Sequence, residues 1–150
     1  IKSLAHLEIE NFRVIIIGNG ELKEDLVVLA NKLNVRNKID FLAVSDASKY
    51  YQQFDCFVQP SHQEGMSIAL LEAMSYGVAP IVCAEKNHPV ITNMVNGLIV
   101  KNNDSVALAK SISRIVLTPE LRKNICQNAR KSVVSRYNIK QCAKKYLDLY

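Results

Sequence analysis

Short apolar runs alternate with helix-patterned segments along the first 100 residues, and this alternation restricts the fold more than any other feature of the chain. Residues 13–17 read RVIII and stop at Gly18-Asn19-Gly20, after which leucines recur at helical spacing. The same order predicts strands at 13–17, 39–42, 56–58, 79–82 and 98–100, and helices at 21–35, 48–54, 68–76 and 89–95. Strands separated by helices run parallel, and wholly apolar strands are covered on both faces. We therefore expect an α/β fold with a Rossmann-like, doubly wound parallel sheet.

The chain beyond residue 100 has a helical pattern throughout. Asp104 is placed to cap one helix, Thr118-Pro119 to open a second, and Asn138 to open a third. Residues 101–150 carry 11 Lys and Arg against 3 Asp and Glu, in a chain whose formal net charge is +5. A solvated helical surface, an anionic membrane surface and nucleic acid are the three explanations of this basic excess. Aromatic residues are not interleaved with the basic ones, which argues against nucleic acid.

The 150 residues, of which 49% are hydrophobic, suit a single domain with one core. No apolar run approaches the roughly 20 residues that a membrane-spanning helix requires. The first ten residues lack the apolar core of a signal peptide and suggest a boundary inside a longer protein. The four cysteines and three histidines lack the spacing of metal ligands, so we expect buried free thiols and no metal site.

The segment at 60–67, PSHQEGMS, is the part of the chain that is richest in candidate binding groups. It joins an expected strand to an expected helix, and ligands of open α/β sheets bind beyond the carboxyl ends of the strands. Gly65 permits close backbone approach, and the N–H groups of residues 65–68 suit a diphosphate at the helix start. From the spacing alone, a Gly65 that only makes a turn and a Ser67 that only caps the helix are equally acceptable.

Glu64 and Glu72 lie eight positions apart across the start of the same expected helix. Apolar residues surround Glu72 in the sequence, so we expect the helix to be buried on several sides and the carboxylate to need a partner. A pair of sugar hydroxyls would satisfy it, because a carboxylate accepts two hydrogen bonds from a vicinal diol. Alternatively, Glu72 shares a solvent-facing stripe with Ser75 and Tyr76. The sequence leaves both readings open.

The stretch at 60–82, PSHQEGMSIALLEAMSYGVAPIV, resembles the donor-site segment of the family-4 retaining glycosyltransferases. The family pattern is PS…EG, an apolar helix, EAM, a small residue and Gly, then Pro and a strand, and its two motif glutamates match Glu64 and Glu72. Nearly the whole chain is similar to the family in order and spacing, through VIIIGNGELKEDL, IDFLAVSDASKYYQQFDCFVQPS, NGLIVKNNDSVALAKSI and RYNIKQCAKKYLDLY. The stretch AEKNHPVITN departs from the family's Gly-Gly followed by an acid, which leaves the role of residues 86–90 open.

The resemblance implies the C-terminal half of a GT-B glycosyltransferase, with this chain as a fragment of its nucleotide-sugar-binding domain. The first strand of that domain, the basic pair that faces the diphosphate, and the N-terminal acceptor domain would all lie outside these residues. The intact protein would then be a hexosyltransferase, whereas this fragment alone would be inactive. The family uses no metal or other cofactor, and a nucleotide diphosphate sugar is the donor substrate.

The resemblance also assigns roles to individual residues. Glu64 would be catalytic, at the reacting carbon of the sugar, either as a nucleophile or as an orienting group. The remaining donor contacts would come from the backbone N–H groups of Gly65, Met66 and Ser67, from Glu72 at the ribose, and from Leu42 and Ala43 within the segment 42–45 at the base.

The expected function is sugar transfer to a glycan or lipid-linked acceptor in cell-surface polysaccharide synthesis. We expect a cytoplasmic enzyme that works with its own N-terminal domain and not with nucleic acid, and a peripheral contact with the anionic inner face of the membrane stays open. The alternative is a non-catalytic, flavodoxin-like binding or regulatory module. The donor sugar, the base, the acceptor and the oligomeric state stay open.

Overall fold

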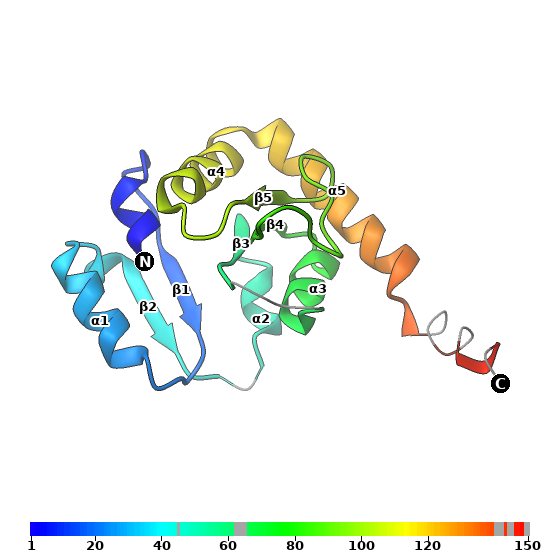
Figure 1. Ribbon diagram of the computed structural model, residues 1–150, viewed down its shortest axis with the longest axis horizontal. Helices are drawn as coiled ribbons and strands as arrows, with labels where there is room; N and C mark the ends of the chain where they lie inside the picture. Colours follow the sequence, from blue (N-terminus) through cyan, green and yellow to red (C-terminus); the bar gives the residue numbers. More distant parts are fainter. Residues whose placement is uncertain (45, 62–65, 140–142, 144–145, 149–150) are drawn as a thin grey trace.

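The computed structural model describes residues 1–44, 46–61, 66–139, 143 and 146–148. Five strands occur in this part of the chain: β1 (Val14–Ile17), β2 (Ile39–Leu42), β3 (Cys56–Gln59), β4 (Ala79–Cys83) and β5 (Leu98–Val100). The helices are η1 (Lys2–His6), α1 (Lys23–Lys32), η2 (Arg36–Lys38), α2 (Ser48–Tyr51), α3 (Ile68–Ser75), α4 (Ser105–Leu117) and α5 (Pro119–Arg136). Strands and helices alternate up to β5, which confirms the predicted α/β class (Figure 1).

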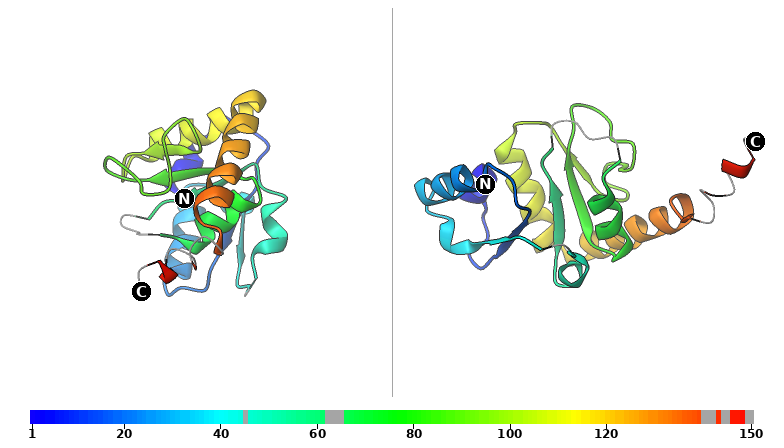
Figure 2. Two further views of the ribbon diagram at one scale, coloured as in Figure 1. Left: turned by 90° about the vertical axis from the view of Figure 1, so that its right-hand side faces the viewer. Right: turned by 90° about the horizontal axis from the view of Figure 1, so that it is seen from below.

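The strands form two parallel sheets. β1 pairs with β2, with Val14 opposite Ile39, and β3, β4 and β5 pair in that order, with Ile81 of β4 opposite Leu98. We expected one continuous sheet, but among the described residues no ladder of hydrogen bonds joins the two sheets. Figure 2 shows β1 and β2 on one side of the molecule, together with α1 and η1.

Helices cover both faces of the three-stranded sheet, as the apolar strands predict. One face, with Ile81 and Leu98, packs against Leu108 and Ile115 of α4 and Ile125 of α5. The opposite face, with Val82 and Phe57, packs against Leu70 and Met74 of α3 and Ala129 of α5. Because α5 contributes to both clusters, it fixes α3 relative to α4. The predicted double winding is therefore confirmed in this half of the molecule.

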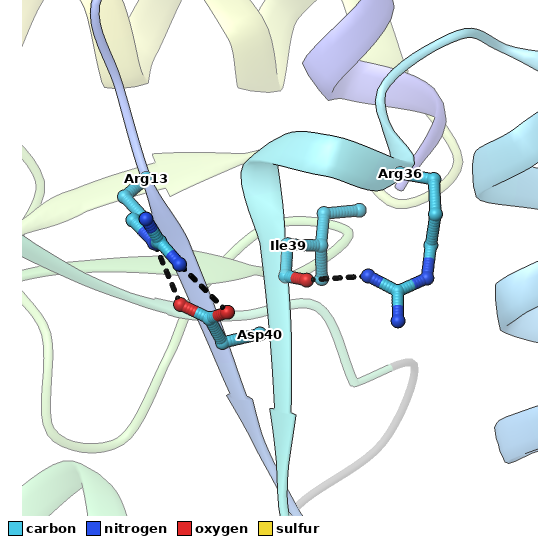
Figure 3. A network of polar contacts seen from close by, with 4 residues as sticks. All are labelled: Arg13, Arg36, Ile39 and Asp40. Atoms are coloured by element: carbon cyan, nitrogen blue, oxygen red, sulfur yellow. Dashed lines mark hydrogen bonds and ion pairs between the residues drawn. The ribbon is translucent and has the colours of Figure 1, made fainter.

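The two-stranded sheet has a separate core on one face. Val14 and Ile16 of β1 and Ile39 of β2 pack there against Ala30 of α1 and Leu4 of η1. Polar contacts also tie the two strands together (Figure 3). Arg13, just before β1, donates through Nε and Nη2 to the two carboxylate oxygens of Asp40 at 2.7 and 3.0 Å. This hydrogen bonding lowers the pKa of Asp40.

The segment between β4 and β5 is not the helix that we predicted at 89–95. Several of its backbone groups bond to side chains instead: Asn96 accepts from the N–H of Thr92 at 2.7 Å and donates to the carbonyl of Val90 at 3.1 Å. Nδ1 of His88 accepts from the N–H groups of Val90 and Ile91 at 3.2 and 3.3 Å. These bonds satisfy the backbone without a helical ladder, and apolar spacing alone could not reveal them.

The helices after β5 begin where the sequence predicts. Asp104 accepts from the N–H of Ala107 at 2.8 Å, and Pro119 occupies the first turn of α5. Most of the predicted third helix lies outside the described residues. Ile139 is described, and it is helical. Within the described part of the chain, every helix is too short or too polar to cross a membrane.

Candidate functional site

The start of α3 presents backbone N–H groups just beyond the carboxyl end of β3. Ser67 is the N-cap, with extended backbone, and its hydroxyl accepts from the N–H of Leu70 at 3.4 Å. Ile68 and Ala69 stand in the first turn, where N–H groups have no helical carbonyl to bond. Ser67 therefore caps α3, and this role is compatible with the binding of an anion at the same end of the helix.

Glu64 and Gly65, predicted as the catalytic carboxylate and the close-approach glycine, lie outside the described residues. Met66, predicted as a backbone donor, has a side chain that is 61% exposed. Ile68 beside it is 73% exposed. Two large apolar side chains therefore stand in solvent at the entrance to α3, where burial against a further surface would be favourable.

Glu72 lies one turn into α3 and is exposed. The same side of the helix carries the exposed Ile68 and Tyr76, while Leu70, Ala73 and Met74 face the core. The expectation of a helix buried on several sides holds where α3 packs against α5, β4 and Tyr51, but the side with Ile68, Ala69 and Glu72 is exposed. Glu72 does stand on a solvent-facing stripe with Tyr76, and it is also held by a partner that the sequence did not indicate.

That partner is Tyr51, the last residue of α2. Its hydroxyl donates to Oε2 of Glu72 at 3.1 Å and lies 3.4 Å from the carbonyl oxygen of Ala69. The ring is only 3% exposed and stacks on Tyr76, with the ring centroids 5.4 Å apart. Burial, followed by the hydrogen bond to Glu72, raises the pKa of Tyr51 to about 12. At neutral pH the phenol therefore keeps its proton and acts as the donor.

Sequence reasoning missed this contact because Tyr51 and Glu72 are 21 positions apart on different helices. A tyrosine near the end of an expected helix was the only local signal. Pairing of the two side chains depends on how α2 packs against α3, through a small core of Tyr51, Ala73 and Val78.

The predicted base-binding residues stand at the end of β2. The carbonyl of Leu42 accepts from the N–H of Gly18 at 2.9 Å, so it already belongs to the ladder with the chain after β1. Ala43 is exposed. Asp46, two residues before α2, accepts from the N–H of Ser48 at 2.8 Å, and this hydrogen bond lowers the pKa of Asp46. The expected base-binding segment is thus connected through α2 to Tyr51 and hence to Glu72.

Cys56, Cys83 and Cys126 are free thiols, but they are partly buried and not fully buried as we expected, and Cys142 lies outside the described residues. Burial raises the pKa of Cys56 to about 12, so this thiol keeps its proton at neutral pH. Across residues 1–44, 46–61 and 66–139, His, Cys, Asp and Glu do not gather in groups of three or more that could hold a metal ion.

The chain belongs to the glycosyl transferases group 1 family, whose model matches residues 1–132. An uncharacterized glycosyltransferase of Methanocaldococcus jannaschii is 33% identical over 150 residues, a match that covers 96% of this chain and 38% of that protein. The UDP-Gal:alpha-D-GlcNAc-diphosphoundecaprenol alpha-1,3-galactosyltransferase of Escherichia coli is 31% identical, over 91% of this chain and 36% of its own length. The chain therefore spans less than two fifths of these relatives.

Solved structures agree on the fold. The C-terminal domain of a group 1 glycosyl transferase, LpcC of Francisella tularensis, has a TM-score of 0.80 at 23% identity and covers 92% of this chain and 77% of that one. HepE of Anabaena in complex with UDP has a TM-score of 0.89 at 18% identity, over 98% of this chain and 42% of that one. The fold is that of the C-terminal half of a GT-B glycosyltransferase, as the sequence resemblance implied.

Proposed function

We propose that this chain is the donor-binding part of a retaining glycosyltransferase that moves a sugar from a nucleoside diphosphate to a glycan or lipid-linked acceptor. The observation that carries the proposal is the exposed Glu72, oriented by Tyr51 one turn from the open N–H groups of α3. The names of relatives support it, since the Escherichia coli protein is described as acting on a diphosphoundecaprenol-linked sugar with UDP-Gal. Family membership favours this function over the flavodoxin-like module.

In the proposed complex, the nucleotide lies across the start of α3. The diphosphate accepts hydrogen bonds from the N–H groups of Gly65, Met66 and Ser67, the ribose hydroxyls donate to Glu72, and the base rests against Leu42 and Ala43. Glu64 orients the sugar beside its reacting carbon. These contacts fix the donor before reaction and stabilise negative charge where it develops.

Transfer breaks the bond between the sugar carbon and the diphosphate oxygen and forms a bond from that carbon to the acceptor oxygen. Retention requires the acceptor hydroxyl to approach on the face from which the diphosphate leaves. The proton of that hydroxyl passes to the departing phosphate. The N–H groups at α3 act on the leaving group, because negative charge accumulates there as the bond breaks.

We propose that the functional enzyme contains further elements outside these 150 residues, namely the first strand of this domain, which would lie beside β1 and β3 in the sheet, the basic pair and an N-terminal acceptor domain. The separation of the β1–β2 ladder from the β3–β5 ladder in the described residues supports such a strand. The short coverage of the relatives supports the additional domain. On this account the chain alone binds the donor weakly and catalyses no transfer.

We further propose a cytoplasmic enzyme in peripheral contact with an anionic membrane. Lys123, Arg130 and Lys131 are exposed on α5, and relatives are named for acceptors linked to undecaprenol. Attraction of this basic face to anionic lipid falls as salt rises. Sedimentation with anionic vesicles at low salt but not at high salt supports the contact, whereas salt-insensitive binding contradicts its electrostatic basis.

The ribose role of Glu72 is tested by titration of the full-length enzyme with UDP, GDP and ADP by calorimetry. Replacement Glu72→Ala should weaken binding of the preferred nucleotide by about 1–3 kcal/mol, the usual loss for a hydrogen bond to a charged group. Glu120→Ala, an exposed carboxylate on α5, is the matched control and should leave the affinity unchanged. Equal affinities of the wild type and the Glu72→Ala variant would remove the ribose role from the proposal.

A further inference from the structure

Tyr51 stands where two parts of the proposed nucleotide site meet. It ends α2, the helix that follows the expected base-binding residues, and it contacts Glu72 on α3, which the proposed function assigns to the ribose. Its ring packs with Ala73 of α3 and Val78, which precedes β4, so α2 is anchored to the same core as α3. The base-binding segment and the ribose carboxylate are therefore joined through one side chain.

We propose that Tyr51 is a positioning residue for the donor nucleotide: its hydroxyl holds Oε2 of Glu72 so that the second carboxylate oxygen accepts from the ribose hydroxyls. This inference rests on the proposed function and adds to it a residue that touches Glu72 rather than the ligand. A glutamate side chain without a fixed partner samples many rotamers, and it loses this conformational entropy when it binds a diol. A carboxylate already held in place binds without that loss.

The surroundings of Tyr51 fix its hydroxyl with little freedom. The ring stacks on Tyr76, meets the edge of Phe54 with the centroids 6.1 Å apart, and lies 6.4 Å from the ring of Phe57. Only 3% of the residue is exposed, and a phenol has few rotatable bonds. The donor that orients Glu72 is thus itself held by packing, which is how a supporting residue keeps a binding group in a productive geometry.

The chemistry of the contact suits a ligand that donates hydrogen bonds. Among the described residues, the ion pairs join Arg13 to Asp40 and Arg122 to Asp55, and none involves Glu72. A neutral phenol donor orients the carboxylate without neutralising it. Lysine or arginine in the same place would compete with the ribose as a charged partner. The arrangement therefore keeps the carboxylate a strong acceptor for hydroxyl groups.

The test compares ribonucleotides with 2′-deoxyribonucleotides in the full-length enzyme, by calorimetric titration of UDP, GDP and ADP and their 2′-deoxy forms. In the wild type, the preferred ribonucleotide should bind about tenfold more tightly than its deoxy form, since one hydrogen bond to a carboxylate is lost. Tyr51→Phe should weaken the ribonucleotide roughly three- to tenfold and the deoxy form, which keeps only the 3′-hydroxyl, by less, so that the ratio falls. The donor KM should rise while kcat changes by less than about twofold, because a binding contact is altered.

Two variants separate the possible outcomes. Tyr76→Phe keeps the ring that stacks on Tyr51 and should leave the ratio at its wild-type value. Glu72→Ala should abolish the discrimination; if it does not, the ribose role and the inference both fail. A different result would be that Glu72→Ala abolishes the discrimination, while Tyr51→Phe weakens the binding of both nucleotides equally or of neither. Tyr51 would then have only a structural role, and this inference would fail while the proposed function stands.

A structure of the wild-type enzyme with UDP tests the proposal even if Tyr51→Phe does not fold. The expected result is a ribose hydroxyl on one oxygen of Glu72 while Tyr51 still donates to the other. A complex in which the ribose contacts Glu72 after Tyr51 has released it would overturn the inference and leave the proposed function standing.

Discussion

The two sheets of this molecule differ in how completely their strands are buried. In β4, Ala79, Ile81 and Val82 are at most 1% exposed, because α4 and the start of α5 cover one face and α3 covers the other. In β1, all four residues are only partly buried, and the described core lies on one face. The three-stranded sheet is thus a complete layered core, and it carries α3 with Glu72. The two-stranded sheet, with its core on one face, should contribute less to the free energy of unfolding.

The largest expected effect comes from equivalent truncations in the two sheets. Ile81→Ala removes a side chain that is fully buried in β4 and should lower the free energy of unfolding by about 2–5 kcal/mol. Ile15→Ala in β1 should lower it by roughly 1 kcal/mol, since that side chain is partly exposed. Urea unfolding of each variant gives the two values. Equal losses would contradict the difference in burial on which this comparison rests.

Two glycines sharpen the same comparison at a smaller scale. A Cβ added at Gly97, before β5, would lie 2.9 Å from side-chain carbons of both Pro80 and Ile91, whereas at Gly20, after β1, it would meet nothing within 4 Å. Gly97→Ala should therefore destabilise the fold by about 1–3 kcal/mol through overpacking. Gly20→Ala should change the stability by less than about 0.5 kcal/mol. Thermal unfolding measures both, and a neutral Gly97→Ala would show that the β4–β5 layer can relax.

An alkaline titration distinguishes the phenol that joins α2 to α3 from the exposed tyrosines. The pKa of Tyr51 is about 12 in the folded protein and near 10 in an unfolded chain. Because the folded value is raised, the associated stability is present below pH 10 and is lost as the pH rises through 12. Absorbance of the folded protein should show one late phenol step that Tyr51→Phe removes. Its persistence in that variant would assign the step to another tyrosine.

The smallest expected effect concerns the exposed pair on the two-stranded sheet. Arg13 lowers the pKa of Asp40 in the folded protein. The stability that this pair contributes is therefore present above the pKa of Asp40 in the unfolded chain and is lost as the pH falls through the pKa in the folded protein. Arg13→Gln should raise the pKa of Asp40 toward its ordinary value and reduce the acid sensitivity of unfolding. A carbon-detected NMR titration of the carboxyl group measures the shift. An unchanged pKa would mean that the pair does not persist in solution.

The sequence predicted local structure well, because strands and helices follow from side-chain patterns within a few residues. β2 and β5 have the predicted bounds, and Asp104 and Pro119 start helices as their chemistry requires. The segment between β4 and β5 could not be predicted, since His88 and Asn96 bind backbone groups that spacing would assign to a helix. Whether a side chain or a carbonyl takes a given N–H depends on tertiary packing.

The candidate site was predictable only in part, for a related reason. The glutamates and the glycine at 64, 65 and 72 form a sequence motif, and the motif led to the family that the comparisons show. The contact of Tyr51 with Glu72 joins positions 21 residues apart and depends on the angle between two helices. The separation of the two sheets likewise depends on which strands lie within hydrogen-bonding distance of each other. The residue pattern of each single strand carries no information about its neighbours.

Hydrogen exchange of the full-length protein, with and without UDP, GDP or ADP, tests the account most directly. The preferred nucleotide should slow exchange in residues 61–72 and at the end of α2, and should leave α4 and the first half of α5 unchanged. Exchange that is identical with and without every nucleotide, or slowed only in α4 and α5, would contradict a donor site at the start of α3.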